Sequence, residues 1–164
     1  MVAIYVVAYL VAIVIANLTV ASFGPSVVIV NAFLLVGLDL TTRDRLHDAW
    51  DGRGLWLRMG LLIGAGGAIS YALGAGQIAI ASCIAFVFAG IADAVTYVVL
   101  GDRQRIVRVN GSNVVGAAVD SLVFPTLAFG ALLPVIVLGQ FAAKVAGGFL
   151  WSLVLAVPVR RRSA

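Results

Sequence analysis

An acidic side chain lies in the middle of an apolar stretch that is long enough to cross a membrane. Residues 112–130 are mostly apolar, and Asp120 lies near their centre. A carboxylate at that depth costs at least ~2.5–3.5 kcal/mol on insertion scales, so it needs a partner or a function. At helical spacing Asn113, Gly116 and Phe124 share its face. This face could bind a flat polar molecule, or it could be a helix–helix contact in which a neighbour neutralises Asp120.

Two more charged residues lie inside apolar stretches at a similar expected depth. Asp93 lies within residues 78–100, and Lys144, the only lysine, lies within residues 133–157. At a rise of roughly 1.5 Å per residue, the two acids lie about 10–12 Å from the ends of their helices, and Lys144 lies nearer the midplane. Lys144 can therefore neutralise one acid, which leaves the other carboxylate free for a substrate or a proton.

Amide side chains extend this polar set. Asn17 lies in the first apolar stretch and should face the bundle interior, either as a helix contact or as a ligand contact, while Gln140 shares a stripe with Lys144. A carboxylate accepts two parallel N–H bonds, and amides both donate and accept. The set is compatible with a purine-like heterocycle, on which aromatic side chains could stack, but the residues alone do not select one. The aromatic candidates are Phe124, Tyr97 and Trp151.

The end of the second apolar stretch carries an acid and a base four residues apart. Asp39 and Arg43 can pair on one face of a helix, and we interpret them as structural or gating residues, such as a salt bridge at a helix end. In the polar segment that follows, Leu46 and Trp50 are spaced for one face of a short interfacial helix. His47 is the only histidine and glutamate is absent, so we expect His47 to be solvated and no metal site to form.

The composition indicates an integral membrane protein. Of the 164 residues 63% are hydrophobic, and one span needs ~20 apolar residues. Six spans therefore use nearly the whole chain as one all-α domain, residues 1–164. The first stretch has no basic residue before it, so we expect a retained span and not a cleaved signal peptide. The expected spans are residues 2–22, 27–40, 55–73, 78–100, 112–132 and 133–157.

Basic residues alternate between the loops. Apart from Lys144, they all lie in or beside the loops after the second and fourth spans or in the C-terminal tail, and the other three loops carry none. Lysine and arginine accumulate in cytoplasmic loops, so both termini are predicted to be cytoplasmic. This distribution explains the net charge of +4 without nucleic acid as a partner.

Motifs of catalytic and nucleotide-binding sites are missing from the sequence. It contains no HExxH, GxSxG or GxxxxGK[ST], and the GAGGA at residues 64–68 lacks the strand and the acid of a dinucleotide loop. We therefore expect neither an enzyme nor a cofactor. A channel would repeat its selectivity groups in a ring, which is not seen, and a structural subunit would not need buried Asp93, Asp120 and Lys144.

Several of these residues resemble the motifs of the bacterial queuosine-precursor transporters, also called the vitamin uptake transporter family. Those are six-span inner-membrane proteins related to the substrate-binding S-components of energy-coupling-factor (ECF) transporters. Some members carry Asn where this chain has Ala117. The resemblance covers nearly the whole chain and rests on Asn17 in IANL, Asp39-Leu40-Thr41-x-Arg43, Asp93 in AGIAD, Asp120-Ser121-Leu122-x-Phe124, and Lys144.

The resemblance implies an inner-membrane carrier with an S-component-like bundle that imports 7-cyano- or 7-aminomethyl-7-deazaguanine for queuosine biosynthesis. Asp120 would read the guanine-like edge of that substrate. The stripe of Ala8, Ala12 and Ala16 resembles the surface by which S-components dock on an ECF ATPase module, and it equally fits ordinary helix packing. The predicted substrate-binding residues are Asp120, Asn17, Asp93, Lys144, Asn113, Phe124 and Gln140.

Two alternatives to this function stay open at the level of sequence. The chain could be an S-component or solo carrier for another vitamin-like heterocycle, or it could be a membrane scaffold that transports nothing. The energy source of transport is also open, because the residues are compatible with a proton, with an ECF module or with facilitated diffusion.

Overall fold

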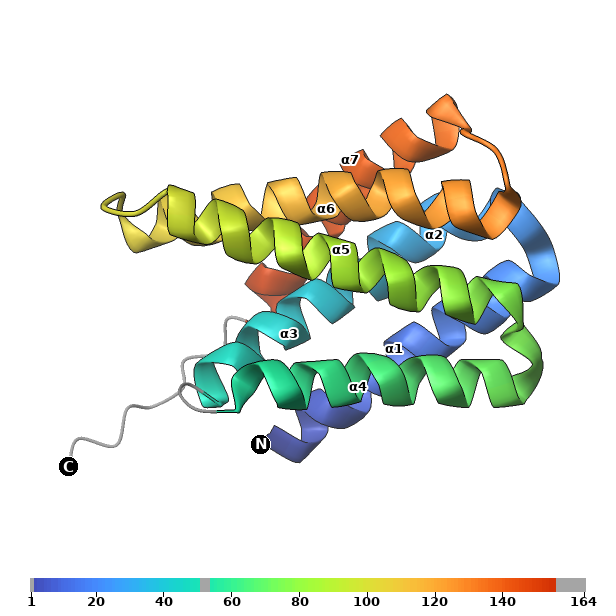
Figure 1. Cartoon of the computed structure of the whole chain (residues 1–164), viewed down its shortest axis with the longest axis horizontal. Coiled ribbons are helices and arrows are strands. Elements are labelled where there is room, and N and C mark those ends of the chain that lie inside the picture. The colour runs from blue at the N-terminus through green and yellow to red at the C-terminus, as the bar shows by residue number, and fades with distance from the viewer. Residues whose placement is uncertain (1, 51–53, 156–164) are drawn as a thin grey trace.

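The computed structural model describes residues 2–50 and 54–155, which are helical almost throughout and contain no strand (Figure 1). Five stretches are helical, long and apolar enough to cross a membrane. The predicted all-α membrane fold is therefore confirmed. The elements are α1 (Val2–Phe23), η1 (Gly24–Val27), α2 (Val28–Asn31), η2 (Ala32–Val36), α3 (Gly37–Ala49), α4 (Leu55–Ser70), η3 (Tyr71–Ala75), α5 (Gln77–Val99), α6 (Arg105–Phe129) and α7 (Pro134–Val154).

The first of these five stretches, Val2–Ala49, folds back on itself. Gly24 has a left-handed φ of 65°, a conformation that glycine adopts without strain, and Pro25 follows it. The chain reverses there, so that α1 lies beside η2 and α3 (Figure 1). The five apolar stretches consequently make six passes along the bundle.

The turns between these passes gather at two ends of the bundle. The α1–α2, α4–α5 and α6–α7 turns lie at one end, and the start of α1 lies at the other end with the α3–α4 and α5–α6 links (Figure 1). The three turns at the first end carry no charged residue, whereas arginines flank the two links at the second. The alternation of basic loops in the sequence thus coincides with the two ends of the bundle.

The packing of the bundle puts polar side chains inside and apolar ones outside. Large side chains such as Ile4, Val99 and Val135 are mostly exposed, at 70%, 78% and 79%, which suits a surface in contact with lipid. Inside the bundle, several polar and charged side chains are almost completely covered. They include Asn17, Asp39, Arg43, Ser70, Asp120, Gln140 and Lys144. In a membrane protein, polar residues arranged in this way mark a functional interior.

Helix α7 packs against η2 and α3 with almost no side chain between the backbones. A Cβ atom on Gly37 would lie 2.6 Å from the carbonyl carbon of Gly147, and a Cβ atom on Gly147 would collide with the carbonyl oxygen of Phe33. Small residues permit this close approach between membrane helices. The contact holds one side of the bundle interior at a fixed distance.

The polar segment after residue 40 does not leave the bundle. Helix α3 continues through it to Ala49, and Leu46 is completely buried against Tyr9 and Met59. The predicted interfacial helix around Leu46 and Trp50 is therefore wrong. The apolar face of this segment finds its partners in α1 and α4, which cover it more completely than a membrane surface would.

Candidate functional site

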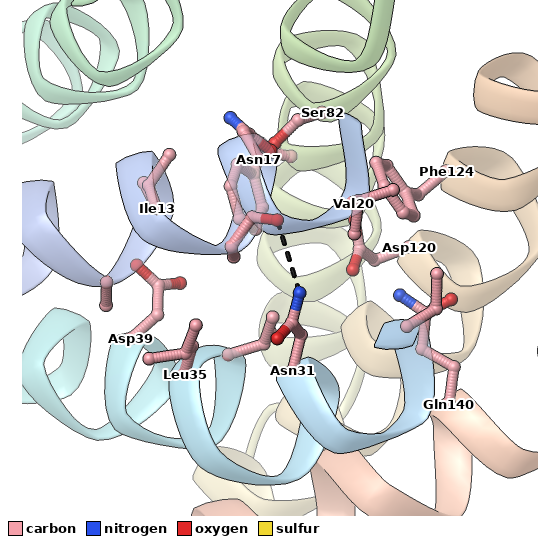
Figure 2. A pocket seen from close by; sticks show the side chains of 15 residues that line it. Ile13, Asn17, Val20, Asn31, Leu35, Asp39, Ser82, Asp120, Phe124 and Gln140 are labelled. Carbon is pink, nitrogen blue, oxygen red and sulfur yellow. Dashed lines mark hydrogen bonds between the residues drawn. The ribbon is translucent and has the colours of Figure 1, made fainter. Parts of the chain in front are cut away.

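A small, mostly apolar cavity with several polar side chains in its lining lies in the centre of the bundle, between α1, α2, η2, α3, α5, α6 and α7 (Figure 2). It encloses about 30 Å³, which is room for about two water molecules at roughly 10–15 Å³ each. A larger molecule would therefore enter only when the surrounding helices separate. The polar lining residues are Asn17, Asn31, Asp39, Ser82, Asp120 and Gln140, and the aromatic ones are Phe86 and Phe124.

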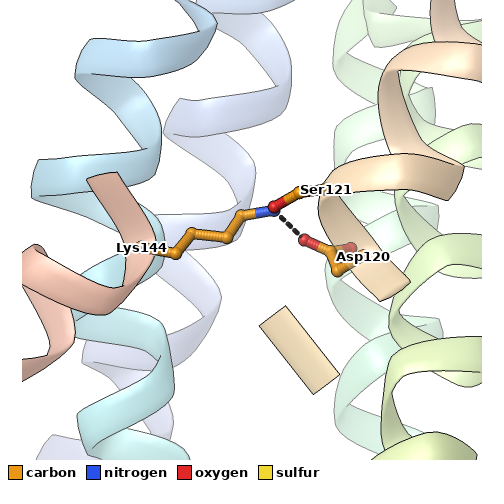
Figure 3. A network of polar contacts seen from close by, with 3 residues as sticks. All are labelled: Asp120, Ser121 and Lys144. Carbon is orange, nitrogen blue, oxygen red and sulfur yellow. Dashed lines mark hydrogen bonds and ion pairs between the residues drawn. The ribbon is translucent and has the colours of Figure 1, made fainter. Parts of the chain in front are cut away.

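The carboxylate of Asp120 is bound to the only lysine of the chain. Lys144 Nζ donates to Asp120 Oδ2 and lies 3.2 Å from Ser121 Oγ, to which it also donates (Figure 3). The Lys144 side chain is 1% exposed and that of Asp120 is 10% exposed, so the pair is largely buried. This confirms the expectation that Lys144 neutralises one of the intramembrane acids, and it identifies that acid as Asp120.

Asp39 lines the same cavity, but its carboxylate has no partner. Only 2% of the residue is exposed, and neither carboxylate oxygen accepts a hydrogen bond from any residue in 2–50 or 54–155. The predicted pair with Arg43 is not formed. Arg43 instead reaches towards α6, where its Nη2 lies 3.4 Å from Asn113 Oδ1, and Asn113 Nδ2 donates to Asp44 at 3.2 Å. These contacts with α6 compete with the local pair.

The π-helical turn η2 explains why Asp39 points into the cavity. Asp39 follows Asn31 by eight residues. In a straight α-helix this spacing would place the two side chains about 80° apart around the helix axis. A π-helical turn closes its hydrogen bonds at i→i+5 and so takes more residues per turn. The five residues of η2 lie between Asn31 and Asp39, and they remove most of that offset. As a result both side chains face the cavity (Figure 2).

The two asparagines of the cavity use their amide nitrogens within the protein. Asn17 Nδ2 donates to Ser70 Oγ at 3.1 Å. Asn31 Nδ2 donates to the carbonyl oxygen of Ala16 at 3.2 Å and to Thr19 Oγ1 at 2.7 Å. Gln140 is 3% exposed, and its Oε1 has no partner among the described residues. Among the described residues, the lining thus keeps unpartnered acceptor oxygens on Asp39 and Gln140.

The predicted substrate-binding residues divide between three cavities. Asp120, Asn17, Phe124 and Gln140 line the central one. Asp93 lies with Arg43 and His47 in a second cavity of about 180 Å³ between α3, α4 and α5. Asn113 and Lys144 line a third, of about 280 Å³, between α3, α6 and α7.

The expected convergence of Asp93 with Asp120 and Lys144 is accordingly not observed. Of the predicted aromatic partners, only Phe124 reaches the central cavity. Tyr97 lies under the Arg108 guanidinium, 3.9 Å from the ring centroid, and Trp151 Nε1 donates to the carbonyl oxygen of Leu34 at 2.8 Å. Tyr97 and Trp151 thus serve contacts of the bundle itself.

Sequence reasoning did not include Asn31, Ser82 and Phe86 in the site, and it gave Asp39 a structural role. Asn31 carried the same signal as Asn17, an amide in an apolar stretch, and could have been included on that ground. Ser82 and Phe86 carried none, because a serine or a phenylalanine is ordinary in a membrane helix. Within the described residues, no group of three or more His, Cys, Asp or Glu could hold a metal ion.

The comparison with protein families gives a match over residues 1–158, to the family described as "Putative vitamin uptake transporter". The comparisons with curated proteins and with solved structures give no match.

Proposed function

Because the chain belongs to the vitamin uptake transporter family, we propose that it imports a 7-deazaguanine precursor of queuosine, such as the 7-cyano or 7-aminomethyl compound. Family membership and the apolar helices make the chain a multi-pass membrane transporter. The choice of substrate rests on the resemblance of its motifs. These are Asp39-Leu40-Thr41-x-Arg43 and Asp120-Ser121-Leu122-x-Phe124.

The observation that supports this substrate most strongly is the set of unpartnered acceptor oxygens in the lining of the central cavity. A 7-deazaguanine presents a ring N–H, an exocyclic amine and the N–H of its five-membered ring, all of which are donors. The cavity offers the unpartnered oxygens of Asp39 and Gln140. Asn31 has already used its amide hydrogens on Ala16 and Thr19. An N–H-rich ligand would satisfy these acceptors, and an acceptor-rich ligand would not.

The third cavity supports a route from the site to the arginine-flanked end of the bundle. Asp120 faces the central cavity and Lys144 faces the third one, so their ion pair separates the two spaces. In our proposal that end is cytoplasmic, because basic residues accumulate on the cytoplasmic side of inner-membrane proteins. Separation of α6 from α7 at the ion pair would then release the substrate inwards.

This orientation is tested with reporter fusions at the two ends of the bundle. A reporter placed after Gly76 should report the periplasm, and a reporter after Gly101 should report the cytoplasm, since Arg58 and Arg103 lie at the second end. The same side for both fusions, or the reverse assignment, contradicts the proposed direction of transport.

The alternative of an S-component would use the same cavity with an ATPase module as partner. Ala12 is 2% exposed, and Ala12 and Ala16 both line the central cavity. The position of these two alanines favours ordinary helix packing for the stripe, while the half-buried Ala8 lies outside the cavity lining. Docking of the module on this stripe stays the prediction of the alternative.

The function is tested by rescue and by binding. Cells that cannot make the precursor should regain queuosine in tRNA when they express the chain and receive 7-aminomethyl-7-deazaguanine. The purified protein should bind that compound more tightly than adenine. Binding of a different vitamin-like heterocycle instead would favour the alternative carrier, and failure to bind any compound would favour a scaffold.

A further inference from the structure

Two carboxylates face the central cavity, and they are in opposite electrostatic situations. We propose that Asp39, and not Asp120, determines substrate specificity by accepting two adjacent N–H donors from the edge of the heterocycle. The inference rests on the proposed function. It assigns substrate recognition to Asp39, which the sequence pattern alone had indicated as a structural or gating residue. The expected ligand class is a planar ring with a ring N–H beside an exocyclic amine.

The first support is the state of the Asp39 carboxylate. It is buried in the bundle, it points into the cavity (Figure 2), and neither oxygen has a donor among the described residues. A buried carboxylate without donors is strongly unfavourable. A ligand that enters the cavity can supply the missing donors, and a carboxylate is the acceptor that takes two parallel N–H bonds.

The second support is that Asp120 is already occupied. Its Oδ2 accepts from Lys144, and the same ammonium group donates to Ser121 (Figure 3). A ligand that used both oxygens of Asp120 would have to displace a buried lysine, which would leave that cation without its counter-ion. Asp120 therefore acts through Lys144 in holding α6 to α7, and at most one of its oxygens remains for a ligand.

The third support is the set of neutral groups around Asp39. Gln140 offers an unpartnered Oε1, and Asn31 is brought to the same side by the η2 turn. Phe124 and Phe86 supply apolar walls for the faces of a ring. Arg43, the nearest cation in sequence, is turned away towards Asn113. The site thus favours a planar ligand with several N–H donors.

The principal test compares Asp39→Asn, Asp120→Asn and, as a matched control at an exposed position, Asp102→Asn. Full-length protein in detergent is assayed for 7-aminomethyl-7-deazaguanine affinity and for the melting temperature without ligand.

Asp39→Asn should weaken binding by about 10- to 100-fold, since a donor then faces a donor, and should keep or raise the melting temperature. Asp120→Asn should lower the melting temperature, because Lys144 loses its partner. Asp102→Asn should match the parent in both.

A second measurement compares two ligands that differ in one donor group. The parent should bind 7-deazaguanine at least about 10-fold more tightly than 7-deazahypoxanthine, which lacks the exocyclic amine, and Asp39→Asn should reduce that ratio. Equal affinity of the parent for the two compounds overturns the proposal. The proposal is also overturned if Asp39→Asn binds the ligand with the parent's affinity. The same holds if Asp120→Asn loses binding while its melting temperature equals that of the parent.

Failure of the proposed function gives a different result from failure of this inference. If the parent binds guanine or another purine but no 7-deazaguanine, the substrate assignment fails. The Asp39 variants are then measured with that purine, and a loss of binding in Asp39→Asn still supports the inference. If Asp39→Asn restores queuosine in tRNA as well as the parent at equal expression, the transport function stands and the role of Asp39 is refuted.

Discussion

The two sides of the central cavity treat a buried carboxylate in opposite ways. On the α6–α7 side, Asp120 is neutralised by Lys144, and the pair joins two helices. On the α3 side, Asp39 is as deeply buried, and its carboxylate accepts no hydrogen bond within residues 2–50 and 54–155. Burial alone therefore does not reveal the role of an intramembrane acid. The partner does, because a paired charge holds the bundle together while an unpaired one is available to a ligand.

The largest effect on stability is expected from a substitution that breaks the ion pair of Asp120 with Lys144. Lys144→Met removes the cation and leaves Asp120 buried with its charge uncompensated, which should lower the free energy of unfolding by about 3–5 kcal/mol. Unfolding of the purified protein by denaturant in detergent measures this directly.

The control for that prediction removes both members of the pair. The double variant Asp120→Asn/Lys144→Met contains neither charge, so it should be more stable than Lys144→Met alone. A double variant whose loss equals the sum of the two single losses would show that the pair contributes no coupling, and the contrast between the two sides would be lost.

An intermediate effect is expected where α7 meets η2. Gly147→Ala forces a methyl group against the carbonyl oxygen of Phe33, and overpacking of this kind costs about 1–3 kcal/mol. It should also weaken ligand binding, because a shifted η2 no longer orients Asp39. Gly60→Ala is the matched control, since no atom lies within 4 Å of the added methyl group, and it should equal or exceed the parent in stability. A stable Gly147→Ala variant with parental affinity would contradict this account.

The smallest effect on stability is expected at Ser70, which accepts the hydrogen bond of Asn17 in the central cavity. Ser70 accepts from Asn17 and donates to the carbonyl oxygen of Gly66 at 2.7 Å. Ser70→Ala should cost about 1 kcal/mol in unfolding free energy, the net value of one hydrogen bond. Ser22→Ala serves as the control, because that exposed hydroxyl bonds only to its own helix, and it should change stability less. If the two serine variants are equally stable, Ser70 does not hold Asn17 in place.

The fold was predictable because lipid imposes strong rules on a sequence. Apolar stretches of sufficient length, alternating basic loops and a Gly-Pro turn together predict a helical bundle. The continuation of α3 was not predictable, because residues 41–49 are polar by composition, and those that become buried, Thr41, Thr42, Arg43 and Leu46, do so only against neighbouring helices. The η2 turn was not predictable either, since its residues Ala32–Val36 are ordinary helix formers.

The part of the candidate site that could be predicted from the sequence is the ion pair, because a charged residue in lipid needs a partner. Lys144 and Asp120 form the pair that their cost in lipid demanded. The pair of Asp39 with Arg43 was predicted because Arg43 at i+4 offered a sufficient local partner, while Arg43 in fact bonds to Asn113 on a distant helix. Sequence spacing records neighbours along one helix, and it does not record competition from another helix.

The turn at Gly24 sets the parity of membrane crossings for the whole chain. Val2–Ala49 is one continuous helical stretch. Counted as a single crossing, it would invert every later helix and send the arginine-flanked links to the opposite side. With the reversal, the count through α7 is even, and the start of α1 and the end of α7 return to the same end of the bundle (Figure 1). A single left-handed glycine followed by proline thus decides which face of the membrane all the later loops meet.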